Sequence, residues 1–244
     1  MKAMIFAAGL GTRLRPLTKD KPKCLVEIAP KVTLLDAVVA RLKRVGVDEV
    51  VLNLHHFPGQ IKTHVAARGN YDIAVHFSYE ETLLDTGGGL RHAADWFRGE
   101  DAFFIHNSDV YTELDLTQML TKHQSAGALA TLAVSQRETS RYLLFDDKHH
   151  LAGWEDQRQG APPVSLLTGH RLAFNGIHVV SGNFLKYLEV ETGAFSIIAA
   201  YLKAAGAGGI IQAFPMDEYF WMDVGTEERL ERLRKYLIEH DSFI

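Results

Sequence analysis

The chain has 244 residues and a formal net charge of −4, and its 47% hydrophobic and 23% charged residues are the balance of a soluble globular protein with room for one large domain or two small ones. No apolar run is long enough for a membrane span, no cleavable signal pattern is present, and the mild acidity argues against nucleic acid as a partner. The single cysteine, Cys24, excludes an internal disulfide, fits a reducing cytoplasm and is expected to be buried.

The first half of the chain alternates strand and helix patterns. Apolar residues at spacings of three and four predict a helix between the first two strands, with Thr33 and Asp36 as a capping box at its start. Weaker patterns predict helices at 57–67, 88–97 and 115–126. Short apolar, β-branched or aromatic runs predict strands at 3–7, 49–54, 73–78 and 102–106. This alternation predicts a mostly parallel sheet covered on both faces.

The second half contains strand patterns without full-length helices between them. Strands are predicted at 129–134, 141–146, 171–181 and near 209–214, a helix near 195–206, and an exposed loop at 154–170. The last segment, 226–240, predicts an amphipathic helix with Leu230, Leu233 and Leu237 on one face. The fold class is therefore α/β, a doubly wound, mostly parallel (Rossmann-like) mixed sheet. We expect one domain over 1–244, with a nucleotide-binding half (about 1–126), a substrate half (about 127–225) and the terminal helix.

Two spaced glycines, Gly9 and Gly11, follow the first predicted strand directly. In open α/β sheets ligands bind at this point, and glycine lets backbone N–H groups approach phosphate oxygens. A dinucleotide fingerprint would need a third glycine where Leu14 stands, and a Walker A loop fails as well. Five basic residues against one acidic residue give the next stretch a local charge of about +4: Arg13, Arg15, Lys19, Lys21 and Lys23. The segment predicts a local anion site.

The whole string AAGLGTRLRPLTKDKPKCL (7–25) resembles the signature of the sugar-1-phosphate nucleotidyltransferases. That signature is a glycine-rich turn, Thr-Arg, a Pro-Leu-Thr step and then Pro-Lys. The resemblance implies two catalytic residues, with Arg13 clamping the β- and γ-phosphates as a fork and Lys23 placing a compact charge on the reacting phosphates. Arg15, Lys19 and Lys21 are assigned to the solvated rim. The resemblance also implies that the following residues bind the nucleotide: Ala8, Gly9, Gly11, Thr12 and Arg13.

Two later segments resemble the same family in the same order. LLDTGGGLRHA (83–93) is similar to its base-binding segment, which implies that backbone at Gly88 reads the nucleobase; close packing at a helix start is the alternative. FFIHNSDV (103–110) is similar to its Asn/Gly-x-Asp strand end, which implies a nucleotide contact from Asn107 and a Mg²⁺ ligand in Asp109.

FWMDVGTEERL (220–230) matches the family's Trp-x-Asp-x-Gly-Thr signature and supplies Asp223 as the second Mg²⁺ ligand. Sequence spacing cannot show whether the two aspartates meet. No Cys, Asp or Glu spacing supports a metal site at the histidine pairs, which are expected to be surface or packing residues: His55, His56, His149 and His150.

The segment AFNGIHVVS (173–181) resembles the family's sugar-pocket strand, which implies that Asn175 and Gly176 lie near the hexose. Many relatives carry a Glu-Lys pair in mid-chain. The equivalent stretch here, LAGWEDQRQG (151–160), offers Glu155 as a sugar ligand but no lysine after it. Whether Arg141 or Arg158 replaces that lysine stays open.

The resemblance implies transfer of a nucleoside monophosphate from a nucleoside triphosphate to a sugar 1-phosphate, with Mg²⁺, in the cytoplasm. The compact length resembles the short branch that contains N-acetylmuramate-1-phosphate uridylyltransferase, which favours UTP. A mannose-1-phosphate guanylyltransferase using GTP and a non-catalytic subunit that senses nucleotide sugars are the alternatives. A nicotinamide oxidoreductase is disfavoured by the failed fingerprint. The expected partners are the two substrates, with no nucleic acid or membrane, and the chain is a monomer or a homodimer.

Overall fold

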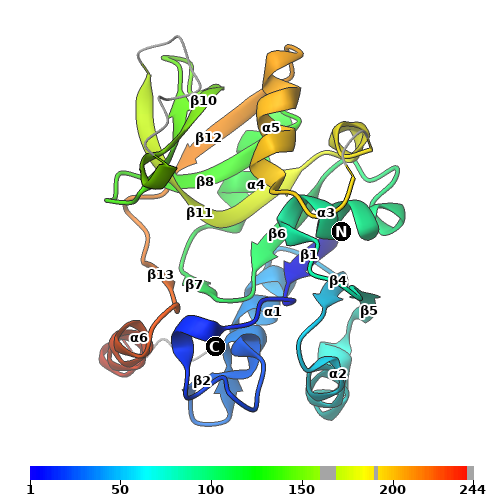
Figure 1. Cartoon of the computed structure of the whole chain (residues 1–244), viewed down its shortest axis with the longest axis vertical. Coiled ribbons are helices and arrows are strands. Elements are labelled where there is room, and N and C mark those ends of the chain that lie inside the picture. The colour runs from blue at the N-terminus through cyan, green and yellow to red at the C-terminus, as the bar shows by residue number, and fades with distance from the viewer. Residues whose placement is uncertain (160–168, 190–191, 241–244) are drawn as a thin grey trace. The chain divides into compact units, whose positions relative to one another are not determined.

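Three strands from the first half form a parallel layer (Figure 1). In the computed structural model, which describes residues 1–159, 169–189 and 192–240, they lie in the order β1 (Lys2–Phe6), β4 (Glu49–Leu54) and β5 (Ala74–Tyr79). Val50 of β4 lies opposite Ala3 on one side and Val75 on the other. Because all three strands run the same way, the residues that follow them meet at one edge of the layer.

By packing, the chain divides into two units. The first unit holds Met1–Leu83, His106–Glu113 and the described residues from Phe220 onward. The second holds the described residues of Leu84–Ile105 and Leu114–Tyr219, and β6 (Phe103–Asn107) carries the chain from one into the other. Residues 84–105 precede residue 126 but belong to the second unit, and the described residues from Phe220 onward return to the first unit.

The helices of the first unit begin and end as their residues dictate. They are α1 (Leu34–Arg44), α2 (Pro58–Ala67) and α6 (Glu227–Glu239). The predicted capping box is present at α1: the Asp36 N–H donates to Thr33 Oγ1 at 3.2 Å, and the Thr33 N–H donates to the Asp36 carboxylate at 2.8 Å. At the start of α2, Pro58 occupies the first helical turn, where its missing N–H costs nothing.

The apolar face of α6 packs into the first unit as the sequence predicted. Leu230, Leu233 and Leu237 are buried in a cluster that also holds Leu14 and Val26 from the N-terminal loop region. The same cluster includes side chains from three short pieces of strand beside α6 in Figure 1: β2 (Glu27–Ala29), β7 (Val110–Thr112) and β13 (Trp221–Asp223). A further short strand, β3 (Val32–Thr33), pairs with β2. The terminal helix therefore supports the segment that follows the glycine loop.

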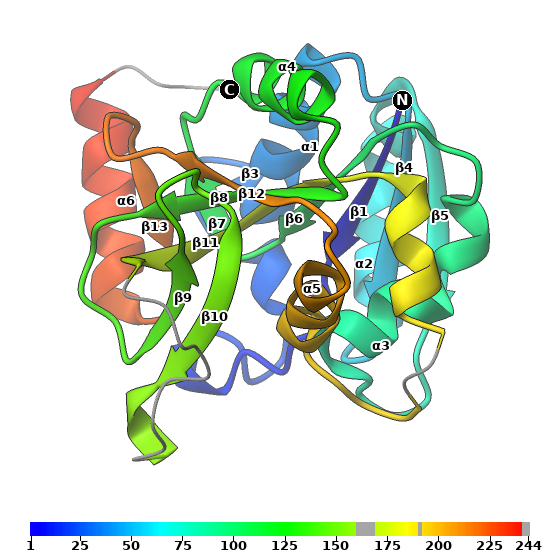
Figure 2. The same ribbon diagram turned by 90° about the horizontal axis from the view of Figure 1, so that it is seen from above.

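The second unit is a mixed sheet with helices on both sides. β8 (Ala130–Ser135) pairs in parallel with β12 (Ile211–Pro215) and antiparallel with β11 (His170–Val180). β11 also pairs with β9 (Arg141–Phe145), which continues as a hairpin into β10 (Leu151–Asp156). Figure 2 shows α4 (Leu116–Ala126) and α5 (Ile197–Gly206) on opposite sides of β8 and β12.

Two predicted elements differ from the structure. The helix expected at 88–97 begins earlier, as α3 (Asp85–His92), and a 3₁₀ turn at Ala94–Trp96 follows it. The loop expected at 154–170 begins instead as strand: residues up to Asp156 pair with β9, and their polar side chains lie on the partly exposed hairpin. Residues 160–168 of that prediction lie outside the described residues.

Two buried histidines predict a loss of stability in mild acid. Burial lowers the pKa of His106, in the first unit, and of His123, in the second, to about 4, whereas an unfolded histidine titrates near pH 6.5. Below pH 6.5 the unfolded chain therefore binds more protons than the native chain, so stability falls as the pH drops towards 4. We expect about 1 kcal/mol per pH unit for each histidine between pH 6 and 5.

Urea unfolding at several pH values measures this slope. His123→Gln, which keeps a partner for Thr131 Oγ1, is expected to reduce it, and the same change at the exposed His92 is the control. An unchanged slope in the His123 variant would show that this histidine does not titrate on unfolding.

Candidate active site

The glycine loop that follows β1 is fixed at both ends. At its start the Ala7 N–H donates to Asn53 Oδ1 at 2.7 Å, and further on Thr18 Oγ1 donates to the Gly11 carbonyl at 2.7 Å. Gly11 has φ +62°, and a Cβ built on it would lie 3.2 Å from both Lys23 Cβ and Thr18 Cβ. Glycine is therefore required here for two reasons: the left-handed backbone and the close approach of the lysine segment.

Lys23 brings together the two aspartates that the sequence left far apart. Its Nζ lies 2.5 Å from Asp109 Oδ2 and 4.0 Å from Asp223 Oδ1. The lysine side chain is only 12% exposed, and the carboxylates are 29% and 26% exposed. Both aspartates therefore converge on one ammonium group within the first unit.

A short antiparallel ladder produces this convergence. Asp223, the last residue of β13, lies opposite Val110, the first residue of β7, and Asp109 immediately precedes β7. The Val224 N–H donates to the Asp109 carbonyl at 2.8 Å, which extends the ladder by one bond. The two carboxylates are thus fixed by backbone pairing.

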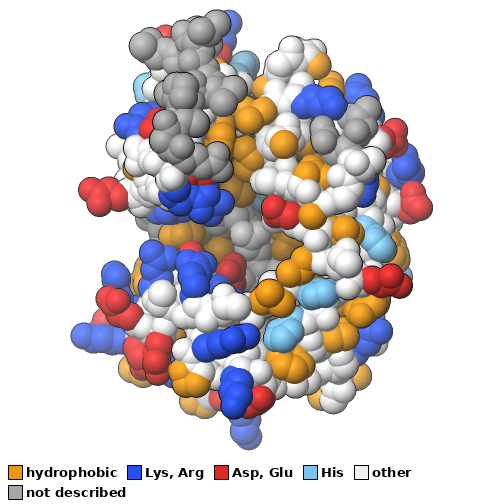
Figure 3. Space-filling model, viewed as in Figure 1, with side chains coloured by type: hydrophobic (Ala, Val, Ile, Leu, Met, Phe, Trp, Pro, Cys, Tyr) orange, Lys and Arg blue, Asp and Glu red, His pale blue; other side chains and the backbone are white. Residues whose placement is uncertain are grey.

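Two arginines reach the same place from different elements. A Cβ built on Gly225 would lie 2.8 Å from Asp223 Oδ1 and 3.2 Å from Arg13 Nη2, which places the Arg13 guanidinium beside this carboxylate. Arg229, on the first turn of α6, donates from Nη1 to Asp223 Oδ2 at 3.2 Å. The sequence analysis missed Arg229. Its position at a helix start, just after Gly225 and Thr226, could have identified it as a neighbour of Asp223. In Figure 3, basic and acidic side chains gather in the lower half of the view, over the loop, β13 and α6.

The aspartate pair fits a divalent cation. Although Asp223 Oδ1 is buried, it has no hydrogen-bond partner among the residues that the structure describes. A carboxylate oxygen without a hydrogen-bond partner, next to a second carboxylate, is suited to bind a cation. In the structure the nearby positive charge is the Lys23 ammonium. Two carboxylates, with water and substrate phosphates completing the shell, suit Mg²⁺. No group of three His, Cys, Asp or Glu side chains that could hold a metal occurs within the described ranges.

The other nucleotide-binding residues predicted in this unit lie around the loop and the strand ends. Asn107 ends β6, two residues before Asp109. Ala8 is buried just after β1, whereas Gly9 and Thr12 are exposed. Beneath the loop, a buried amide and carboxylate escaped the sequence analysis: Asn53 Nδ2 donates to Glu80 Oε1 at 2.7 Å while its Oδ1 holds the Ala7 N–H.

Gly88 lies in the second unit, inside α3, and is buried. Its N–H and that of Gly87 both donate to the Phe195 carbonyl, at 3.3 and 2.9 Å. A Cβ built on Gly88 would lie 2.8 Å from the Gly193 carbonyl oxygen. The Gly88 N–H, one of the backbone groups expected to read a nucleobase, is therefore engaged by Phe195, and close packing, the alternative for this segment, also explains a glycine here.

The predicted sugar-binding residues also belong to the second unit. Asn175 is buried, and its Oδ1 accepts from Arg137 Nε at 3.0 Å. Gly176 follows at φ +78°, where the pairing of β11 with β8 shifts register, and this left-handed backbone explains the glycine. Glu155, on β10, accepts from Arg171 Nη2 at 2.8 Å.

The family's mid-chain lysine is absent here, and the contacts of Arg141 and Arg158 do not show that either arginine replaces it. The Arg158 Nε donates to Asp156 Oδ1 at 2.9 Å, and this ion pair lowers the pKa of Asp156 to about 2. Arg141 is exposed at the start of β9, opposite Asp156.

The single cysteine is buried, as predicted. Burial raises the pKa of the Cys24 thiol to about 12, which keeps it protonated and unreactive at neutral pH. Its place in the chain, next to Lys23, therefore reflects packing under the loop.

Comparison with known proteins shows which sequences the chain resembles. Residues 2–149 match the model of the nucleotidyl transferase family. The chain is 30% identical over 230 residues to the mannose-1-phosphate guanylyltransferase catalytic subunit beta of Dictyostelium discoideum, covering 92% of this chain and 61% of that protein. It is also 30% identical over 246 residues to the N-acetylmuramate alpha-1-phosphate uridylyltransferase of Caulobacter vibrioides, covering 93% and 92%.

A solved structure shows the same fold. The crystal structure of a putative glucose-1-phosphate thymidylyltransferase from Bacillus anthracis matches with a TM-score of 0.81 and 18% identity, over 97% of this chain and 94% of that one. This likeness confirms the predicted α/β fold class with its mixed sheet. Within the described part of the chain, no helix has both the length and the apolar character needed to cross a membrane.

Proposed function

Since the chain belongs to the sugar-1-phosphate nucleotidyltransferase family, we propose that it transfers a nucleoside monophosphate from a nucleoside triphosphate to a sugar 1-phosphate and releases pyrophosphate. The observation that carries the proposal is the convergence of Asp109 and Asp223 on Lys23. A chain that only sensed nucleotide sugars would not need this arrangement of a lysine between two partly buried carboxylates. We expect the reaction to take place in the cytoplasm, catalysed by a monomer or a homodimer.

The chain's own groups would position and neutralise phosphates. Asp109 and Asp223 would hold a Mg²⁺ ion, which when bound supplies positive charge to the reacting phosphates. Lys23 would donate its N–H groups to phosphate oxygens. The attacking sugar phosphate oxygen is already ionised, so no general base is needed, and catalysis rests on alignment and charge.

The glycine loop and Arg13 would hold the departing pyrophosphate. The Asn53–Glu80 pair fixes the first residue of the loop, which favours a preformed backbone cradle after β1. Arg13, beside Gly225 and Asp223, offers a fork of N–H donors to two phosphate oxygens.

For the substrates we favour UTP and a sugar like N-acetylmuramate 1-phosphate, with GTP and mannose 1-phosphate as the second candidate. The two relatives that bear these names are equally identical to the chain, so identity does not separate them. UTP is preferred because the chain covers 92% of the uridylyltransferase but only 61% of the guanylyltransferase subunit, so its length resembles the former.

A competition assay tests the proposal. Equimolar UTP, GTP, dTTP and CTP are mixed with Mg²⁺ and a panel of hexose 1-phosphates, and the NDP-sugars are identified by mass spectrometry. UDP-sugar is expected to predominate. Mainly GDP-sugar would overturn the uridylyl preference alone, whereas no NDP-sugar from any pair would overturn the reaction class.

The proposed phosphate fork predicts a difference between two neighbouring arginines. Arg13→Lys keeps the charge but loses the paired N–H donors, so kcat/KM should fall at least about 10-fold. Arg15→Lys, at the exposed rim of the same loop, is the matched control and should stay within about 2-fold of wild type. Steady-state rates of pyrophosphate release measure both. Equal effects would show that the assignment of one arginine to the site and the other to the rim is wrong.

A further inference from the structure

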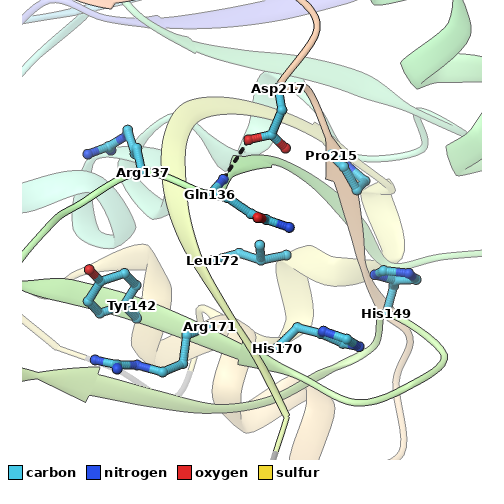
Figure 4. Close-up of a pocket in the computed structure, with 9 residues that line it drawn as sticks. All are labelled: Gln136, Arg137, Tyr142, His149, His170, Arg171, Leu172, Pro215 and Asp217. Atoms are coloured by element: carbon cyan, nitrogen blue, oxygen red, sulfur yellow. Dashed lines mark hydrogen bonds between the residues drawn. The ribbon is translucent and has the colours of Figure 1, made fainter.

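The second unit contains a cavity of about 360 Å³ that no part of the proposed mechanism uses. Its walls come from the residues after β8, the start of β9, the β9–β10 turn, the start of β11 and the end of β12 (Figure 4). None of its lining residues belongs to the group formed by Arg13, Lys23, Asp109 and Asp223. A volume of this size suits a small ligand.

Buried or partly buried partners hold the two arginines of the cavity in place. Arg137 donates from Nε to the buried Asn175 Oδ1 at 3.0 Å and from Nη2 to the Phe174 carbonyl at 2.8 Å. Arg171 donates to the Glu155 carboxylate at 2.8 Å, and its guanidinium carbon lies 4.4 Å from the centre of the Tyr142 ring. Two of the residues expected to bind sugar, Asn175 and Glu155, therefore orient side chains of this cavity.

The polar groups of the cavity alternate between donors and acceptors. The Gln136 N–H donates to Asp217 Oδ1 at 2.7 Å, and the side-chain amide of Gln136 lies between Asp217 and Leu172 in Figure 4. Asp217 Oδ2 adds an acceptor on this wall, and Arg171 adds donors on the opposite one. Leu172 and Pro215 provide apolar surface between them.

Charge decides which ligand such a cavity suits. Glu155 neutralises Arg171, and Asp217 adds a negative charge to the lining. The rings of His149 and His170 stack at 5.6 Å between centroids, with the exposed Asp147 carboxylate 3.8 Å from His170. The carboxylates of Glu155 and Asp217 offset the guanidinium groups of Arg137 and Arg171, so these four side chains together offer a phosphate dianion no net attraction. Hydroxyl groups, which both donate and accept, fit the alternating walls.

We propose that this cavity binds a neutral, hydroxyl-rich ligand of monosaccharide size that is distinct from the sugar 1-phosphate substrate. The apolar surface of Leu172 and Pro215 would face the C–H groups of a sugar ring, while Asp217 and Gln136 would hold adjacent hydroxyls. Asn175 and Glu155 act as positioning residues for the site, because they reach it through Arg137 and Arg171.

Binding is tested on the full chain without catalysis. Saturation-transfer NMR with glucose, mannose, N-acetylglucosamine and inorganic phosphate, each at about 10 mM, detects affinities down to the millimolar range. At least one neutral sugar is expected to bind and phosphate is not. Asp217→Asn keeps an acceptor for the Gln136 N–H but turns the second oxygen into a donor, so it should weaken sugar binding at least about 10-fold. Glu218→Gln, next in the chain but outside the lining, is the matched control.

The proposal would be overturned if no neutral sugar binds, or if phosphate binds more tightly than the sugars. It would also be overturned if the Asp217 variant binds the sugar as well as wild type does while its thermal unfolding is unchanged. A rise in KM for the sugar 1-phosphate in the Asp217 variant would instead make the cavity part of the substrate site and contradict a separate one. Failure of the transferase assay alone would leave this result intact, because the binding measurement does not depend on turnover.

Discussion

Asp223→Asn is expected to lower kcat at least about 100-fold, a loss of roughly 2.7 kcal/mol of transition-state stabilisation. The amide removes one of the two negative charges that face Lys23 and the proposed cation. Asp109→Asn should have an effect of the same order, because its carboxylate holds the lysine at 2.5 Å. Folding should change little, since β13 and β7 pair through their backbones.

Two measurements separate the metal role from a structural one. Initial rates at saturating substrates are taken across a Mg²⁺ titration, and direct binding of Mn²⁺ is followed by electron paramagnetic resonance. Both aspartate variants should bind Mn²⁺ more weakly, and Glu228→Gln, an exposed carboxylate on the first turn of α6, should match wild type. Wild-type turnover by either aspartate variant at saturating Mg²⁺ would remove that residue from the mechanism.

Lys23→Met is expected to reduce kcat by about 100- to 1000-fold while leaving metal binding intact. The ammonium lies between the two carboxylates and competes with a cation for them. Without it, Asp109 and Asp223 repel each other and should bind Mn²⁺ at least as tightly as in the wild type. The combination of lost turnover with retained or tighter metal binding distinguishes the lysine from the aspartates.

Lys21→Met is the matched control, because Lys21 is exposed two positions earlier in the same loop. It should keep wild-type kcat and Mn²⁺ affinity. If Lys23→Met bound Mn²⁺ more weakly than wild type, the lysine would be supporting the metal site rather than the substrate phosphates.

The sequence suggested candidate site residues, but it did not show how they are arranged. The string from Ala7 to Leu25 identified Gly11, Arg13 and Lys23, because each has a chemical or conformational reason to be that residue type. The meeting of Asp109 with Asp223 depends on β7 and β13, which are three residues each. Strands so short show no periodicity, so their pairing could not be predicted.

The contacts of two polar residues were missed for a different reason. Asn53 sits in EVVLNL, where apolar neighbours make it look like one polar position in an ordinary strand, yet it links Ala7 to Glu80. Glu155 was expected in a loop because WEDQRQ is polar, but it lies on a hairpin and pairs with Arg171. In both cases the partner comes from a distant segment, and single-sequence patterns carry no information about it.

Asp109 and Asp223 stand 114 positions apart, and one short ladder brings them together. During synthesis, a nascent chain that stops before β13 already contains the glycine loop, Lys23 and Asp109, yet only one carboxylate of the pair. Closing so long a loop carries an entropic cost, and contacts of this kind form slowly. We therefore expect the enzyme to become competent only when α6 docks and secures β13, so that disrupting the Leu230–Leu233–Leu237 face would lower activity without altering any of the proposed reacting groups.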